Sequence, residues 1–318
     1  MTTKLLITGG CGFIGANLCE YLLNKGGYQL RVLDNLSAGR QEYLERVYRR
    51  TGHRIELIHG DIRDRGIAAE AVRGMDAVVH LAAKTSVVDS LTDPEEVFQV
   101  NVMGTLNLLE ACREHSVGRF VFASSNAAVG EQEPPIDERK VPAPISPYGA
   151  SKLAGEALCA AYFGSFGIKA IALRFSNVYG PFSEHKGSAV AEFIRCIKHG
   201  KPLVIYGDGK QTRDFVYAGD VCRAIELALG YDPKDAADLV FQIGSGKETS
   251  LLQLVEALQT VARENGLEVP AVHHEPSRAG EIRRNFSNID RARERLGYSP
   301  QVGVEEGLRK TWRSFFHL

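Results

Sequence analysis

The chain has 318 residues, of which 44% are hydrophobic and 24% charged, and its formal net charge is -1. This length suits one large two-layered unit or two modest domains, and the composition is that of an ordinary globular protein. A near-zero charge without a basic block lacks the electrostatic signature of a nucleic-acid binder. The longest apolar runs are too short to span a bilayer, so we expect neither a nucleic-acid nor a membrane partner.

The six cysteines are scattered along the chain and form no C-x-x-C pair. Their spacing predicts neither a metal cluster nor a disulfide framework. The first strand-like run begins within three residues of Met1, which leaves no room for a signal peptide. We therefore expect a cytoplasmic protein. His273 and His274 are adjacent but have no third ligand at a fitting spacing, so we expect no metal site.

Short β-rich runs alternate with longer segments of helical period through the first half of the chain. Strands are predicted at residues 4–8, 29–34, 55–59, 77–81, 119–124 and 169–175, and helices at 13–24, 65–73, 95–115 and 148–165. Nearly continuous apolar strands such as AVVHLAA are typical of a parallel sheet that is buried on both faces. The alternation of strands and helices predicts an α/β fold with a doubly wound parallel sheet.

A glycine cluster follows the first predicted strand. Gly9, Gly12 and Gly15 have the spacing G-x-x-G-x-x-G at the mouth of a predicted helix. Glycines there let backbone N–H groups approach a pyrophosphate at the positive helix end, which a Cβ would obstruct. The triplet alone is equally compatible with a simple helix-entry turn.

The second predicted strand ends at Asp34, about 20 residues beyond the last glycine, where a carboxylate can accept hydrogen bonds from an adenosine ribose. Asp34 could also be a plain turn residue at a strand end. Glycines and acid together favour a Rossmann-type dinucleotide site. A carboxylate at this place repels the 2′-phosphate of NADP, so the expected cofactor is NAD.

After about Asn177 the alternation becomes irregular, with more Gly and Pro. This change predicts a smaller C-terminal α+β lobe. We expect residues 1–177 to form the NAD-binding domain and residues 178–318 to form mainly a substrate-binding lobe. A strand near 239–244 is expected to return to the main sheet.

A second group of residues carries the chemistry. Tyr148 and Lys152 are four apart in the run SPYGASK and therefore lie on one face of a helix. A tyrosine needs its pKa lowered by about three units to act as a base near neutrality, which an adjacent ammonium and a positive nicotinamide ring can supply. Ser125, at the end of a predicted strand, can hydrogen-bond the reacting oxygen. A Tyr-x-x-x-Lys pair alone is usually a surface pair, but with Ser125 and an NAD site it indicates a catalytic set.

These motifs resemble the extended short-chain dehydrogenases/reductases, in the branch that acts on nucleotide sugars and includes the UDP-hexose 4-epimerases. The resemblance covers essentially the whole chain. It implies a bound NAD, a nucleotide-sugar substrate such as a UDP-hexose, and a homodimer. It rests on runs that include TGGCGFIG, LDNLS, GDIRD, HLAAKTSV, FASS, SPYGASKLAGE, RFSNVYGP and PSRAGEIR.

The resemblance also implies the remaining residues of both sites. The guanidinium groups of Arg213 and Arg278 suit a diphosphate, and the alternative is a pair with Asp214 or Glu281 at the surface. The cofactor would contact Gly9, Gly12, Phe13, Ile14, Gly15, Asp34, Asn35, Ser37, Asp61, Ile62, Leu81, Ala82, Ala83, Lys84, Asn101, Tyr148 and Lys152. The nucleotide sugar would contact Ser86, Ser125, Asn126, Tyr148, Asn177, Val190, Arg213, Arg278 and Glu281.

One departure bears on the reaction. Dehydratases of this fold carry an Asp-Glu pair after the catalytic serine or threonine, and UDP-glucuronate decarboxylases carry a glutamate at the second of these positions. Here the two residues are Asn126 and Ala127, and neither can transfer a proton. The expected function is therefore an NAD-dependent UDP-hexose 4-epimerase that forms a transient 4-keto sugar with Tyr148 as base.

Several alternatives stay open from the sequence. The substrate could be UDP-N-acetylglucosamine or UDP-glucuronate, and an acid from a distant loop would allow 4,6-dehydration. The fold also serves as a non-catalytic NAD-binding module. Asn126 either ties down its loop, as such residues commonly do, or touches the sugar.

Overall fold

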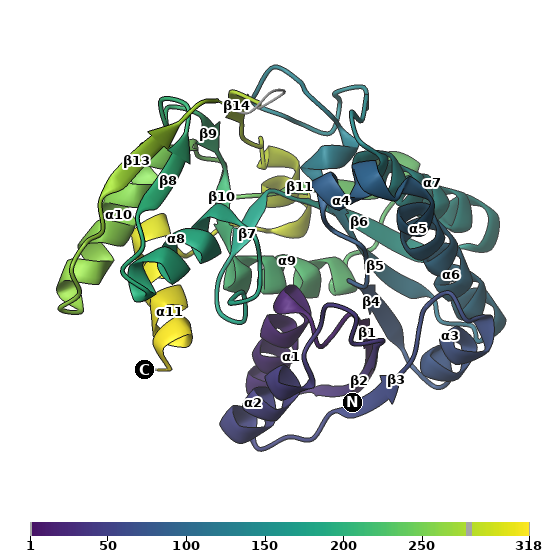
Figure 1. The fold of residues 1–318 in the computed structure, drawn as a ribbon. Helices are drawn as coiled ribbons and strands as arrows, with labels where there is room; N and C mark the ends of the chain where they lie inside the picture. Colours follow the sequence, from purple (N-terminus) through teal and green to yellow (C-terminus); the bar gives the residue numbers. More distant parts are fainter. Residues whose placement is uncertain (1, 278–281, 318) are drawn as a thin grey trace.

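The main feature of the computed structural model, which describes residues 2–277 and 282–317, is a seven-stranded sheet (Figure 1). Neighbouring strands are parallel throughout, in the order β11-β6-β5-β4-β1-β2-β3. The predicted doubly wound α/β class is confirmed. Because the order reverses between β1 and β4, the carboxyl ends of these strands open a crevice for a ligand. The strands are β1 (Thr3–Thr8), β2 (Tyr28–Asp34), β3 (Glu56–His59), β4 (Ala77–His80), β5 (Arg119–Ser125), β6 (Lys169–Phe175) and β11 (Val240–Ile243).

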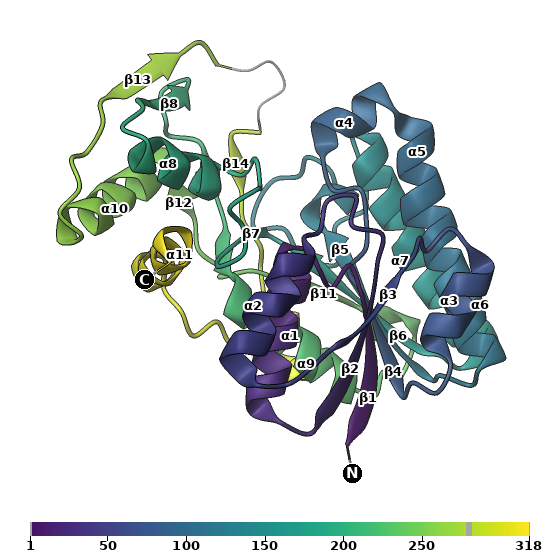
Figure 2. The same ribbon diagram turned by 60° about the horizontal axis from the view of Figure 1, so that its bottom comes forward.

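Helices cover both faces of the sheet, as Figure 2 shows. Alternate residues of the central strand enter different cores, with Leu5 and Ile7 in one and Leu6 in the other. This double burial explains why the strands are continuously apolar. One face carries α1 (Phe13–Lys25), α2 (Gln41–Thr51) and α9 (Ala218–Gly230), and the other carries α3 (Arg65–Val72), α6 (Gly104–Glu114) and α7 (Pro147–Phe166).

The segment predicted as one helix over residues 95–115 differs in the structure. It consists of α5 (Pro94–Phe98), a π-helical turn η1 (Gln99–Met103) and α6. Its apolar periodicity is helical throughout, so the sequence holds no signal for the wider turn. Wider turns of this kind are frequent at functional sites, and this one contains Asn101, whose side chain contacts the crevice loop. In the first half of the chain, α2 and α4 (Val87–Thr92) were not predicted.

Part of the second half of the chain packs into a smaller lobe with a separate core around Trp312, which is 1% exposed, while α9 and residues near 289–298 pack against the main sheet. Residues 240–243 leave this lobe and pair with β6 as β11. The short strands are β7 (Asn177–Tyr179) beside β10 (Phe215–Tyr217), β8 (Leu203–Tyr206) beside β13 (Val272–Glu275), and β9 (Thr212–Arg213) between β12 (Thr249–Ser250) and β14 (Arg284–Asn285). The remaining elements are α8 (Ala189–Lys198), α10 (Leu251–Glu264), α11 (Val304–Phe316), η2 (Asn126–Ala128), η3 (Ala236–Asp238) and η4 (Ala292–Leu296).

The structure shows whether any helix could span a membrane and whether metal-binding side chains are grouped together. Across residues 2–277 and 282–317, no helix is both long and apolar enough to cross a membrane. His273 and His274 lie in β13, and the same residues contain no group of three or more His, Cys, Asp or Glu side chains placed to hold a metal ion.

Candidate active site

The glycine-rich turn leads from β1 into α1 at the open end of the sheet. Gly9 has a φ of 70°, in the left-handed region that favours glycine. A Cβ on Gly15 would lie 2.3 Å from the carbonyl oxygen of Gly9, which is closer than any packing allows. Gly12 caps α1 without a side chain, so the first N–H groups of the helix face the crevice. The turn therefore has the shape that a pyrophosphate requires.

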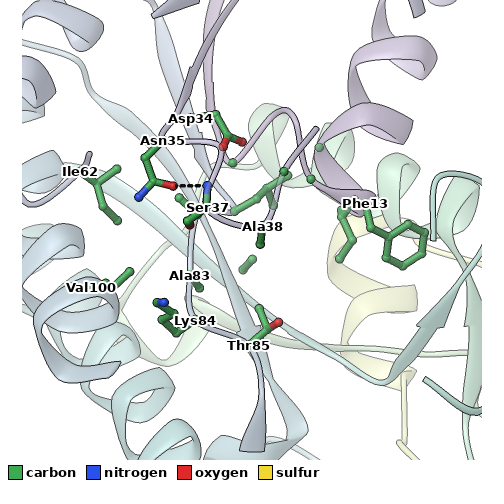
Figure 3. A pocket seen from close by; sticks show the side chains of 18 of the residues that line it. Phe13, Asp34, Asn35, Ser37, Ala38, Ile62, Ala83, Lys84, Thr85 and Val100 are labelled. Atoms are coloured by element: carbon green, nitrogen blue, oxygen red, sulfur yellow. Dashed lines mark hydrogen bonds between the residues drawn. The ribbon is translucent and has the colours of Figure 1, made fainter. Parts of the chain in front are cut away.

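A cavity of about 250 Å³ lies against this turn, at the carboxyl ends of the central strands (Figure 3). The expected cofactor residues gather there from the turn after β1, from α1, from the end of β2 and the loop after it, from the loops after β3 and β4, and from α7. Asn101 is the exception, because it lies behind the cavity wall. Those that line the cavity are Gly9, Gly12, Phe13, Ile14, Gly15, Asp34, Asn35, Ser37, Asp61, Ile62, Leu81, Ala82, Ala83, Lys84, Tyr148 and Lys152.

Asp34 lies at the end of β2 and is 7% exposed. Its carboxylate accepts hydrogen bonds from the backbone N–H groups of Cys11, at 3.0 Å, and Leu36, at 2.8 Å. Burial raises the pKa of Asp34, and these two hydrogen bonds oppose that rise. Each carboxylate oxygen keeps a lone pair for a ribose hydroxyl, since one bond uses one lone pair. The following positions are Asn35 and Leu36, so no arginine stands there to hold a 2′-phosphate.

Asp61 lines the same cavity, in the loop after β3. Its carboxylate accepts two hydrogen bonds from the Arg63 guanidinium, at 3.0 and 2.8 Å, and one from the Asn35 amide, at 2.9 Å. The Arg63 guanidinium holds the pKa of Asp61 well below its usual range. Arg63 also pairs with Glu96 at 2.9 Å. Sequence reasoning missed Arg63 and Glu96, which both line the cavity, because their pairing joins segments far apart in the chain.

Asn101 organises the cavity wall. Its side-chain amide exchanges two hydrogen bonds with the backbone of Lys84, at 2.8 and 3.0 Å, and donates a third to the Ser151 hydroxyl at 2.9 Å. Asn101 thereby fastens the loop after β4 to α7. Its place in the structure is that of a support for the cavity.

Ser125, Tyr148 and Lys152 come together where β5 ends beside α7. Ser146 caps this helix at 3.1 Å from the N–H of Gly149, so the tyrosine is in the first turn. The Lys152 ammonium donates to the carbonyl oxygen of Ala123 at 2.8 Å and lies 5.9 Å from the centre of the Tyr148 ring. The i,i+4 spacing thus brings the ammonium beneath the ring, as the sequence pattern predicts.

Burial dominates the proton affinities of this group. It raises the pKa of Tyr148, and a hydrogen bond with Ser125 works against the rise. It lowers the pKa of Lys152 to about 8, while the nearby Glu156 carboxylate opposes that fall. Lys152 therefore keeps its charge near neutrality. The effect of burial exceeds that of Ser125, so the pKa of the phenol is raised in the protein without a ligand.

Glu156 lies one turn beyond Lys152 on α7 and forms a buried ion pair. Its carboxylate accepts two hydrogen bonds from Arg174 of β6, at 2.8 and 2.7 Å, and the two side chains are 5% and 4% exposed. The Ser124 hydroxyl donates a third. The pair joins α7 to β5 and β6 directly below the catalytic group.

A second cavity of about 540 Å³ adjoins the first and extends into the smaller lobe. Of the expected substrate residues, Ser125, Tyr148, Asn177, Val190 and Arg213 line it. The lining also includes residues that were not among the expected substrate contacts, although Thr85 and Ser176 lie in the runs HLAAKTSV and RFSNVYGP. Examples are Thr85, Ser176, Lys186, Tyr206, Gln211 and Phe215.

Two of the other expected substrate residues, Ser86 and Asn126, do not line this cavity. Ser86 caps α4, and its hydroxyl accepts from the N–H of Asp89 at 3.1 Å. Asn126 is 7% exposed and donates to the Ser287 hydroxyl at 2.9 Å, outside the lining of both cavities. Its contacts are those of a residue that ties down a loop. Arg278 and Glu281 lie outside the described residues.

Comparison with known proteins identifies the family of this chain. The model of the NAD dependent epimerase/dehydratase family matches residues 5–244. The chain belongs to this family. It is 36% identical over 311 residues to a putative UDP-glucose 4-epimerase of Methanocaldococcus jannaschii, covering 96% of each chain. It is 34% identical to a dTDP-glucose 4,6-dehydratase of Streptomyces niveus, covering 97% of this chain and 91% of the relative.

A solved structure of the family agrees with the fold. The crystal structure of Thermus thermophilus UDP-glucose 4-epimerase in complex with NAD has a TM-score of 0.86 and 35% identity, with 99% of both chains covered. Family membership makes NAD the cofactor, and the glycine turn, Asp34 and the first turn of α1 fit it. The predicted resemblance is confirmed at the level of the family, whose members perform both epimerisation and dehydration.

The nucleotide released from the purified protein by heat should be NAD. Asp34 repels a 2′-phosphate, and the one nearby arginine of the cavity lining, Arg63, is already paired with Asp61 and Glu96. Mass spectrometry of the supernatant measures the released nucleotide, and a sample kept cold controls for free nucleotide. Recovery of mainly NADP would contradict the role of Asp34.

Proposed function

We propose that this chain is an NAD-dependent UDP-hexose 4-epimerase that interconverts UDP-glucose and UDP-galactose. The supporting observation is that the site contains Tyr148 as a candidate base but lacks the two acidic residues that dehydratases carry after the catalytic serine or threonine. Tyr148 lines both cavities with Ser125 beside it, while the positions that carry acids in dehydratases hold Asn126 and Ala127.

The residues have distinct roles in this proposal. The Tyr148 oxygen takes the proton of the C4 hydroxyl, Ser125 hydrogen-bonds the same sugar oxygen, and Lys152 stabilises the phenolate by its charge. When bound, NAD would supply reversible hydride transfer at C4, so that the hydride could return to the opposite face of the 4-keto sugar. After the ketone turns over, Tyr148 returns its proton to the oxygen at C4. No atom is lost, so substrate and product have the same mass.

Dehydration is the second candidate, because one relative of this chain is a 4,6-dehydratase. That reaction needs an acid to protonate the leaving hydroxyl and a base for the C5 proton. The carboxylate that lines the second cavity among the described residues is Glu192, and it pairs with Arg195 on its own helix. The buried amide of Asn126 is held by Ser287. These contacts favour epimerisation.

The test is an incubation with UDP-glucose, UDP-N-acetylglucosamine, UDP-glucuronate and dTDP-glucose, followed by NMR and mass spectrometry. We expect inversion at C4 of UDP-glucose without a change in mass. Inversion of the acetylated or uronate sugar in its place would reassign the substrate within the same reaction. A product lighter by one water or one carbon dioxide would contradict the epimerase proposal, and binding without turnover would favour a non-catalytic module.

We further propose a division of labour between the two parts of the chain. Residues 1–177 hold NAD, and residues 178–318 mainly hold the nucleotide sugar, since Val190, Arg213 and Phe215 of the second part line the second cavity. All six cysteines are free thiols, which suits a reducing compartment such as the cytoplasm.

We also propose a homodimer. Apolar side chains are exposed together on α4, α5 and the adjoining π-helical turn, a grouping that favours a protein contact. The occupant that we propose for this surface is a second copy of the chain. The residues are Val87, Val88, Leu91, Phe98 and Met103, which are 45%, 73%, 65%, 40% and 43% exposed.

A further inference from the structure

Lys186 lies at the boundary between the two cavities, in the segment between β7 and α8. It lines both of them, together with Phe13 of the first turn of α1 and Tyr148. It reaches this place from the smaller lobe, across from Thr85 in the loop after β4, whose side chain Figure 3 shows at the cavity. Its ammonium therefore faces the space where a cofactor and a substrate would meet.

The surroundings of Lys186 leave its charge uncompensated. Its ammonium donates to the neutral hydroxyl of Thr85 at 3.3 Å. Within residues 2–277 and 282–317, no ion pair includes Lys186, whereas Lys84 of the same cavity pairs with Glu96 at 3.7 Å. Burial lowers the pKa of Lys186, and no neighbouring carboxylate opposes that fall. A partly buried cation with a neutral partner is costly unless an anion joins it.

The segment that carries Lys186 is firmly held. The Arg195 guanidinium donates to the carbonyl oxygens of Glu184 and Lys186 at 2.7 and 2.8 Å. The Glu184 carboxylate pairs with Arg46 of α2 at 3.1 Å. The next residue, His185, is hydrogen-bonded to the Tyr43 hydroxyl at 2.9 Å. Contacts with two helices thus fix the backbone, and the ammonium is directed into the cavity without support from an anion.

We propose that Lys186 binds a phosphoryl oxygen of a diphosphate ligand at the junction of the two cavities. A lysine ammonium is a point charge that suits this chemistry. The diphosphate belongs either to NAD, which would lie against the first turn of α1, or to the nucleotide sugar. The second source rests on the proposed function, whereas the first rests on the family's cofactor alone.

The test uses Lys186→Met in the full chain, with Lys186→Arg as the conservative variant and the exposed Lys201→Met as control. Calorimetry measures the Kd of NAD on nucleotide-stripped protein, and the Kd of UDP and of uridine on NAD-loaded protein. We expect Lys186→Met to raise the Kd of NAD or of UDP by at least about tenfold, which corresponds to the loss of one charge-assisted hydrogen bond. Uridine binding should be unchanged, and Lys186→Arg should recover part of the loss.

Each outcome has one meaning. Weaker NAD binding assigns the cofactor diphosphate, and weaker UDP binding with unchanged uridine binding assigns the substrate diphosphate. NAD and UDP affinities both within twofold of wild type would overturn the proposal, as would an equal loss in Lys201→Met. If wild-type protein binds no UDP, the proposed function fails while the NAD measurement still decides the role of Lys186. A thermal melt checks the fold, which should be intact because an unpaired charge is removed.

Discussion

Turnover should fall by about 100- to 10,000-fold when Tyr148 is replaced by phenylalanine, the usual contribution of a positioned proton acceptor. The change removes only the phenolic oxygen of Tyr148, a residue that lines both cavities and whose pKa is lowered by Ser125 against the effect of burial. The ring remains above Lys152, 5.9 Å from its ammonium, so the packing is conserved. The measurement is the kcat for the sugar that the substrate panel identifies.

A matched control lies on the same helix. Tyr162 is also buried in α7, and its hydroxyl bonds to Glu110, away from both cavities. Tyr162→Phe should leave kcat within a few-fold of wild type. Both variants should retain NAD, which heat release and mass spectrometry check. Activity of Tyr148→Phe near that of the Tyr162 variant would remove Tyr148 from its assigned role.

Breaking the buried ion pair between Glu156 and Arg174 should lower the free energy of unfolding substantially. Arg174→Met leaves the Glu156 carboxylate buried with only the Ser124 hydroxyl as its donor. Breaking one side of a buried pair costs about 3–5 kcal/mol, since the remaining charge loses its hydrogen-bonded partner. The free energy of unfolding in urea measures this loss. The double variant Glu156→Leu with Arg174→Met should recover much of it, because both charges are gone.

An exposed pair with the same geometry supplies the comparison. Arg113 donates two hydrogen bonds to Glu110, at 3.1 and 2.8 Å, but its side chain is 41% exposed. Arg113→Met should change the unfolding midpoint very little, because water replaces the lost partner. If Arg174→Met lowered the free energy of unfolding as little as Arg113→Met does, burial would not explain the contribution of the Glu156–Arg174 pair to stability.

The sequence by itself determined the parts of this protein that depend on residues close together in the chain. The glycine spacing located the turn into α1, and the acid at the end of β2 was correctly expected at the same cavity. Continuous apolar runs marked the strands, because a strand covered on both faces excludes polar residues from either side. The i,i+4 spacing of Tyr148 and Lys152 was enough to place them on one helix face. Most of the cofactor cavity was therefore predictable.

Only the tertiary structure decided the features that join distant segments. Lys186 meets Thr85 across 101 residues, and Asn126 meets Ser287 across 161. The wider turn in the segment 95–115 likewise coincides with the contact between Asn101 and the Lys84 backbone. No local pattern in the sequence encodes such contacts. A polar side chain forms the same turns and helix caps with its sequence neighbours, whichever distant residue it contacts in the folded protein. Its partner is chosen when the folded sheet brings the loops at its carboxyl edge together, which is why the substrate side was the less predictable half of the site.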